Sequence, residues 1–187
     1  MNLHMVKIVV VIWVASEIGL NLFKRAGAGA VSKDRQSCGL ILLVSTAAAM
    51  AGTNAALRLT SCALPWPKGF FVLGTCLFFP GVLLRWYSII HLGRFFTVNV
   101  AIASDHRVVD TGPYRYLRHP SYTGSLLAIA GFSLMLQNWA AFLVIILPIF
   151  FVTLWRIHVE EAALLGAMGD GYRSYMLRTK RLIPLIY

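Results

Sequence analysis

The chain has 187 residues, of which 58% are hydrophobic and only 13% are charged, and its formal net charge at pH 7 is +10. A soluble domain carries roughly a quarter charged residues, so the composition excludes an ordinary soluble protein. The basic residues are divided among short segments beside apolar stretches, which argues against nucleic-acid binding and favours contact with anionic membrane lipid.

Apolar stretches close to the length of a membrane span recur along the chain. In chain order we expect about five transmembrane helices, near residues 7–23, 38–57, 69–91, 120–137 and 139–157. The last two are joined so closely that they must form a tight helical hairpin. The polar segment near 158–180 has apolar residues at helical spacing and predicts a C-terminal amphipathic helix. The expected fold is therefore all-α, with residues 1–187 in a single membrane domain.

The lysines and arginines predict the orientation of the chain. Thirteen of the 17 fall in three regions, which lie after the first span, after the third span, and at and beyond the end of the fifth span. Short loops rich in Lys and Arg stay on the cytoplasmic side of a membrane. We therefore expect the N-terminus outside, and the 93–119 segment and the C-terminus in the cytoplasm.

Two charged residues fall inside predicted spans, Glu17 in the first and Arg85 in the third. An ionisable residue at membrane depth is a candidate for function. The two side chains can pair, line the same cavity, or reach out to the interface, and the sequence leaves these alternatives open. Small residues along the fourth span, including Gly124 and Gly131, predict close helix packing.

Two arginines, a histidine and three tyrosines are concentrated at the start of the fourth span. Pro120 suits the first turn of a helix, so His119 is expected at the N-cap. The free N–H groups and the positive dipole end there attract a carboxylate. Tyr122 follows in the first turn, while Tyr114 and Arg118 approach from the loop. The alternative is an interfacial belt of aromatic and basic residues.

A second charged cluster closes the fifth span and contains Arg156, His158, Glu160 and Glu161. Arg156 and Glu160 are four residues apart and can pair on one helix face. Because the hairpin makes the last two spans neighbours, this cluster should meet His119 at the same level. It is either a salt-bridged helix end or one wall of a site.

Other motifs are missing. The run Gly27-Ala28-Gly29 lacks the third glycine and the preceding strand of a dinucleotide site. We also find no P-loop and no histidine cluster suited to a membrane di-iron site, so no metal cofactor is expected.

Together, the motifs within residues 91–187 resemble the isoprenylcysteine carboxyl methyltransferase family of membrane enzymes. The matching runs are Asp105-His106-Arg107-Val108-Val109, Gly112-Pro113-Tyr114, Arg118-His119-Pro120-Ser121-Tyr122, Arg156 followed by Glu160-Glu161, Gly169-Asp170-Gly171-Tyr172-Arg173-Ser174-Tyr175, and Arg181-Leu182-Ile183-Pro184. The acidic run stops at Ala162, whereas it often extends further in the family. The short chain is closer to prokaryotic members, which places it in an inner or plasma membrane.

The resemblance implies an S-adenosylmethionine-dependent methyltransferase that acts on the carboxylate of a prenylcysteine-like or other lipophilic acceptor. The cofactor would bind between the last two spans and the tail, and a lipid-side tunnel would admit the prenyl chain. The implied cofactor contacts are Val108, Val109, Tyr114, Arg118, His119, Tyr122, Glu160, Glu161, Tyr172 and Tyr175. Arg156 would face the acceptor carboxylate, and it forms the candidate catalytic set with Glu160 and Glu161.

Three alternatives stay open. The first is a phospholipid or small-thiol methyltransferase of the same superfamily, and the second is an NADPH-dependent sterol-type reductase. The third is a membrane scaffold or lipid-binding protein without enzymatic activity.

Overall fold

The computed structural model describes residues 3–23, 31–34, 36–96, 100–102 and 108–184. Within these residues the α-helices are α1 (Leu3–Phe23), α2 (Gln36–Arg58), α3 (Pro67–Leu92), α4 (Pro120–Met135), α5 (Trp139–Met168) and α6 (Asp170–Arg178). The predicted all-α fold class is confirmed. The glycine run at 27–29 and the motif residues 105–107 lie outside the described residues.

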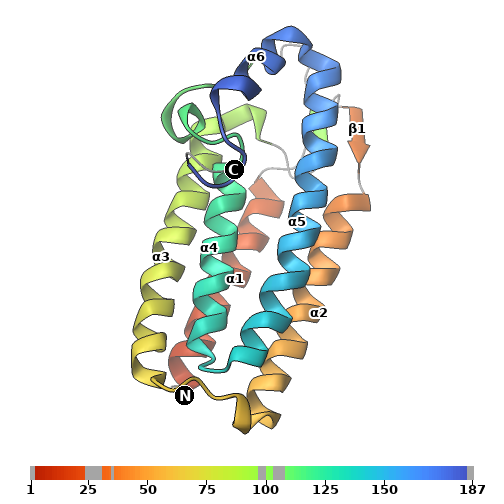
Figure 1. Ribbon diagram of the computed structural model, residues 1–187. Helices are drawn as coiled ribbons and strands as arrows, with labels where there is room; N and C mark the ends of the chain where they lie inside the picture. Colours follow the sequence, from red (N-terminus) through yellow and green to blue (C-terminus); the bar gives the residue numbers. More distant parts are fainter. Residues whose placement is uncertain (1–2, 24–30, 35, 97–99, 103–107, 185–187) are drawn as a thin grey trace.

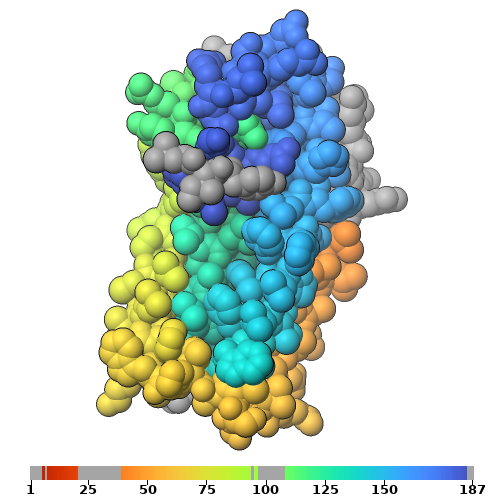
Figure 2. All heavy atoms as spheres, in the orientation of Figure 1, coloured from red at the N-terminus to blue at the C-terminus, as the bar shows by residue number. Residues whose placement is uncertain are grey.

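The helices form an elongated bundle (Figure 1). Helices α3, α4 and α5 lie side by side, with α2 packed beside α5 and α1 behind α4. Figure 2 shows the side chains of α3 and α5 meeting those of α4 on this face of the molecule. The turn between α4 and α5 is at the lower end, and α6 lies at the upper end. The upper end therefore brings together the start of α4, the end of α5 and α6.

Within the described residues, three helices are long and apolar enough to cross a membrane: Gly39–Arg58, Pro67–Leu92 and Trp139–Met168. Helix α1 contributes a shorter apolar stretch, Ile8–Leu20. The 16 residues of α4 rise about 24 Å, less than a bilayer core of about 30 Å. The chain is an integral membrane protein, and the count of five spans stays a prediction.

Two short strands, β1 (Val31–Asp34) and β2 (Val100–Ile102), pair in antiparallel fashion, with Val31 opposite Ile102. This pairing joins the connection after α1 to the connection after α3. Neither segment has the alternating apolar run of four to eight residues that predicts a strand, so the sequence does not indicate it.

Glycines bring α3 and α4 into backbone contact. A Cβ added to Gly124 would lie 2.6 Å from both the Arg85 nitrogen and the Gly81 oxygen. A Cβ added to Gly131 would lie 2.5 Å from the Gly74 oxygen. No side chain fits at these distances unless the helices separate, so the predicted close packing is confirmed.

We expect Gly124→Val to destabilise the protein by about 1–3 kcal/mol, because it overpacks an interface made of backbone atoms. Gly166→Ala is the control, since a Cβ there meets nothing within 4 Å. That change should be neutral or add up to about 1 kcal/mol through helix propensity. Thermal unfolding in detergent measures both variants, and equal midpoints would contradict the close approach of α3 and α4.

The predicted hairpin between the last two spans is present. Helix α4 ends at Met135, slightly before the expected boundary, and Gln137 adopts a φ of 58°. Asn138 caps α5 by accepting from the Ala141 N–H at 3.0 Å. Its amide nitrogen donates to the Leu59 carbonyl at 2.8 Å, which fixes the turn against the end of α2.

Helix α5 continues to Met168, well past the expected end of the span at 157. The charged Arg156 and Glu161 do not end it, because both are buried and paired inside the fold. Gly169, with a φ of 53°, ends the helix. The predicted amphipathic segment is therefore the last part of α5 followed by α6.

Candidate functional site

A cavity of about 770 Å³ runs from the upper end of the bundle down among the helices. Its polar upper part, which we call the chamber, is bordered by Tyr114, Arg118, His119, Tyr122, Glu160, Tyr172 and Tyr175. Its lower part, which we call the apolar arm, is bordered by Trp13, Val14, Phe78, Phe132, Ile145 and Ile149. Along α5, Glu160 and Ile145 are about 22 Å apart. One cavity therefore joins a polar compartment to a long apolar one.

The loop before α4 is held against the C-terminal segment. The backbone N–H of Arg118 donates to the Lys180 carbonyl at 2.7 Å, and the His119 N–H donates to the Arg181 carbonyl at 3.1 Å. The hydroxyl of Thr123 donates to the Leu182 carbonyl at 2.8 Å. His119 is the N-cap residue of α4, as predicted. These bonds fix the C-terminal segment beside the first turn of α4.

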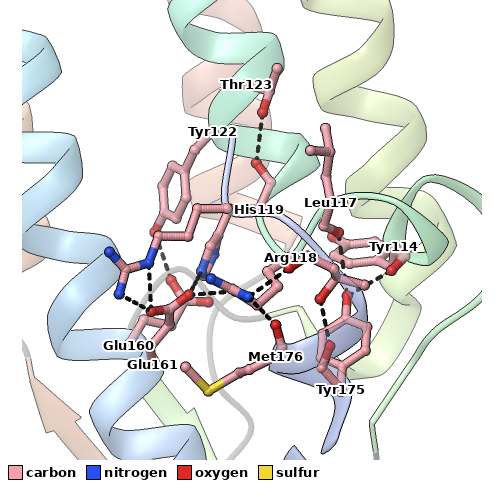
Figure 3. A network of polar contacts seen from close by, with 12 residues as sticks. Tyr114, Leu117, Arg118, His119, Tyr122, Thr123, Glu160, Glu161, Tyr175 and Met176 are labelled. Carbon is pink, nitrogen blue, oxygen red and sulfur yellow. Dashed lines mark hydrogen bonds and ion pairs between the residues drawn. The ribbon is translucent and has the colours of Figure 1, made fainter. Parts of the chain in front are cut away.

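Glu161 is the centre of a buried ion cluster (Figure 3). Its Oε1 accepts from Arg118 Nε at 2.8 Å and lies 3.2 Å from His119 Nε2. Its Oε2 accepts from Arg181 Nε at 3.0 Å and lies 2.9 Å from Arg181 Nη2. Glu161 is only 4% exposed. It therefore ties the end of α5 to the loop before α4 and to the C-terminal segment.

Arg118 also anchors α6. Its Nη1 donates to the carbonyls of Met176 at 2.7 Å and Thr179 at 2.8 Å. These carbonyls lie at the C-terminal end of α6, where helix carbonyls lack partners and a positive charge is favourable. Arg118 therefore holds α6 at the edge of the chamber.

The hydroxyl of Tyr122 connects two charged residues of α5. It donates to Glu160 Oε2 at 2.9 Å and accepts from Arg156 Nε at 3.3 Å. Arg156 is 3% exposed, yet it borders the cavity together with Glu160 and Tyr122. The predicted meeting of the two polar clusters is therefore observed.

Buried tyrosines supply neutral donors around the chamber. The hydroxyl of Tyr175 donates to the carbonyls of Tyr114 at 2.7 Å and Leu117 at 3.3 Å, as Figure 3 shows. Burial raises the pKa of Tyr114, Tyr172 and Tyr175 above the usual tyrosine value. Their hydroxyls therefore stay protonated at physiological pH.

Glu17 and Arg85 form an ion pair. Arg85 Nη2 donates to Glu17 Oε2 at 3.0 Å, and Arg85 Nε lies 3.0 Å from Glu17 Oε1. Both residues also border the cavity. Of the alternatives that the sequence leaves open, two therefore hold: the side chains pair with each other, and they line the same cavity.

All but one of the predicted site residues border the cavity. Those that do are Val108, Val109, Tyr114, Arg118, His119, Tyr122, Arg156, Glu160, Tyr172 and Tyr175. Glu161 does not border it, because both of its oxygens face the cluster of Arg118, His119 and Arg181. The geometry gives no support to a cofactor contact at Glu161 and indicates a structural role instead.

Sequence reasoning gave no role to Arg181, which neutralises Glu161. The signal was present, because Arg181 opens the closing Arg-x-x-Pro motif. Its target could not be read from that motif, because the ion pair depends on how the C-terminal segment folds back.

A family model described as the isoprenylcysteine carboxyl methyltransferase (ICMT) family matches residues 72–166, which is just over half of the chain. The chain belongs to this family. Within the family match lie both polar clusters, from Val108 to Glu161. Tyr172, Tyr175 and Arg181 follow it.

The chain is similar to curated members of the ICMT family. It is 31% identical over 151 residues to a protein-S-isoprenylcysteine O-methyltransferase of Schizosaccharomyces pombe, a match that covers 68% of this chain and 64% of the relative. It is 31% identical over 121 residues to the protein of that name from Tribolium castaneum, covering 61% and 41%. The chain thus matches less than two thirds of the length of either relative.

A solved ICMT structure shows the same fold. It is described as a eukaryotic intramembrane Ras methyltransferase, and it superposes with a TM-score of 0.67 at 29% sequence identity. The superposition covers 75% of this chain and 52% of the solved chain.

Proposed function

We propose that this chain is an integral-membrane S-adenosylmethionine-dependent methyltransferase that methylates the carboxylate of a prenylcysteine-like or other lipophilic acceptor. The observation that carries the proposal is the single cavity, which has a polar chamber above and an apolar arm below. Such a cavity suits a polar cofactor and an acceptor with an apolar tail. The names of the similar proteins support the same reaction.

The chamber residues fit S-adenosylmethionine. Glu160 supplies a carboxylate and Tyr122 an aromatic ring, and both attract a cationic group. We assign cofactor binding to His119, Tyr122 and Glu160, with Val108 and Val109 at the edge of the chamber. When bound, the cofactor would supply the methyl group from its sulfonium, with a neutral thioether as the leaving group.

The apolar arm would hold the tail of the acceptor. Side chains of α1 and α2 border the cavity and have large exposed fractions, with Ile18 54%, Leu42 62% and Met50 64% exposed. We infer that this wall of the cavity opens toward lipid. An acceptor anchored in the bilayer would reach the arm between these two helices.

The acceptor needs orientation more than activation. A carboxylate is ionised at neutral pH because such groups titrate near pH 4, so no general base is needed. Arg156 borders the cavity beside Tyr122 and would orient the carboxylate. The chain's main contributions are alignment of the two reactants and exclusion of water.

We place the chamber on the cytoplasmic side of a prokaryotic inner or plasma membrane, with the N-terminus outside. The support is the excess of Lys and Arg in the segments expected at the upper end of the bundle. Cytoplasmic S-adenosylmethionine would then have direct access to the chamber.

Methyl transfer tests the proposal directly. The purified protein is incubated with methyl-labelled S-adenosylmethionine and either N-acetyl-S-farnesylcysteine or N-acetyl-S-methylcysteine, which has the same head but no long tail. We expect label in a base-labile ester with the farnesylated acceptor only. Equal labelling of both acceptors, or label in a base-stable product, would contradict the assignment.

A further inference from the structure

The Glu17–Arg85 pair is not used by the site described so far. Stability alone does not explain it, because a buried ion pair is often no more stabilising than apolar residues of similar volume. Both residues border the cavity, and the side chain of Glu17 is 28% exposed. The pair is therefore placed to contact a ligand.

The pair lies where the chamber passes into the apolar arm. Arg85 Nη1 donates to Ser125 at 2.5 Å and to Ser121 at 3.4 Å, both on α4. Arg156 of α5 contacts Tyr122, the residue after Ser121. Two arginines thus reach the start of α4 from α3 and α5. Below them the cavity wall is mainly apolar, with Ala128 on α4 and with Ser45, Thr46 and Thr153 as its hydroxyl side chains.

Arg85 retains some capacity for a ligand. A guanidinium has five N–H donors in a fixed fork. Its Nε and Glu17 Oε1 are 3.0 Å apart, but their alignment does not make a hydrogen bond. The hydrogen bonds of Nη1 and Nη2 use three of the five donors, which are directed to Ser125, Ser121 and Glu17. The guanidinium also lies 5.8 Å from the Trp13 ring.

Glu17 weakens the electrostatic attraction of Arg85 for a ligand carboxylate. An isolated arginine would attract a carboxylate strongly and hold its electron pairs in a bidentate bond, which lowers its nucleophilicity. An arginine already paired with a carboxylate attracts a second one more weakly. Such a pair can orient the acceptor without neutralising it.

We propose that the Glu17–Arg85 pair binds the carboxylate of the lipophilic acceptor at the junction of chamber and arm, with Glu17 limiting how strongly Arg85 neutralises it. This proposal rests on the proposed methyltransferase function. It adds acceptor-binding residues from α1 and α3 to Arg156. The apolar tail would then extend from this junction into the arm.

The test compares Arg85→Lys with Glu17→Gln, because the two changes should shift the Michaelis constant in opposite directions. Arg85→Lys removes the fork and should raise KM for N-acetyl-S-farnesylcysteine roughly tenfold, the size of one charge-assisted hydrogen bond. Glu17→Gln removes the negative charge beside Arg85, so Arg85 should hold the acceptor carboxylate more tightly. Both KM and kcat should therefore fall. If the pair only tethers α1 to α3, both variants should instead change KM in the same direction.

Ser16→Ala is the matched control. Trp86 Nε1 donates to Ser16 Oγ at 2.6 Å, which is another tether between α1 and α3. Ser16 and Trp86 are not among the described residues that border the cavity. We expect Ser16→Ala to leave KM and kcat unchanged. If it reproduces the kinetic shifts of Glu17→Gln, the pair is only a tether and the proposal is wrong.

A binding measurement separates this proposal from the methyltransferase function. Calorimetry compares N-acetyl-S-farnesylcysteine with its methyl ester and needs no turnover. The wild-type protein should prefer the acid, Arg85→Lys should reduce that preference roughly tenfold while Arg156 keeps the remainder, and Glu17→Gln should increase it. Equal binding of acid and ester to the wild type would overturn the pair's role, even if methyl transfer is observed. If the expected preferences for the acid are observed but methyl transfer is not, the result would support carboxylate binding by the pair and count against the methyltransferase reaction.

Discussion

Replacing Glu161 with Gln is expected to destabilise the fold strongly. Gln keeps the size of the side chain but removes the negative charge that faces Arg118, His119 and Arg181. Removing one partner of a buried ion pair costs about 3–5 kcal/mol, because the remaining charges stay buried without compensation. Glu161 is 4% exposed, so solvent gives little relief.

The stability of the Glu161→Gln variant is measured by thermal unfolding in detergent. We expect the midpoint to fall by about 6–20 °C, since about 1 kcal/mol shifts it by 2–4 °C in a chain of this size. Arg178→Gln is a control on the surface, where its ion pair with Asp110 spans 3.7 Å between exposed side chains. Exposed pairs contribute little. If the two variants unfold at the same temperature, the ion cluster does not hold the chamber together.

Replacing the neighbouring Glu160 with Gln is expected to have the opposite consequence, a folded protein that binds S-adenosylmethionine poorly. Glu160 borders the chamber and accepts a hydrogen bond from Tyr122. Gln can still accept that bond, so the fold should persist. Loss of the charge should weaken binding of the cationic cofactor by about tenfold to a hundredfold, the effect of opposite charges about 6–12 Å apart at an effective dielectric of about 20.

Calorimetry on the Glu160→Gln variant should compare S-adenosylmethionine with S-adenosylhomocysteine. Only the former carries a sulfonium, so its affinity should fall more. Unchanged affinity for both ligands would remove Glu160 from the cofactor site. An equal loss for both would move its contact to a part of the cofactor that the two molecules share.

The sequence predicted the arrangement of the site better than the roles inside it. The hairpin of α4 and α5 follows from the short connection at Gln137 and Asn138, and it forces the two polar clusters together. The pattern Glu160-Glu161 cannot show which carboxylate faces the cavity. That depends on the C-terminal segment, which returns Arg181 to the second glutamate.

The helix ends were predicted less well for a physical reason. A hydropathy pattern ends a span where charges appear, but Arg156 and Glu161 are buried and hydrogen-bonded inside the fold and α5 continues through them to Met168. The pairing of β1 with β2 depends on contacts between distant connections and leaves no local pattern. Whether Glu17 and Arg85 pair could likewise be decided only once α1 and α3 were placed together.

Calorimetric titration of the purified protein with S-adenosylhomocysteine, with NADPH as the comparison, tests the central claim most directly. The polar chamber above an apolar arm predicts micromolar binding of S-adenosylhomocysteine and no binding of NADPH. Binding of NADPH alone would contradict the methyltransferase assignment and favour a reductase. Binding of neither ligand would remove the chamber as a cofactor site.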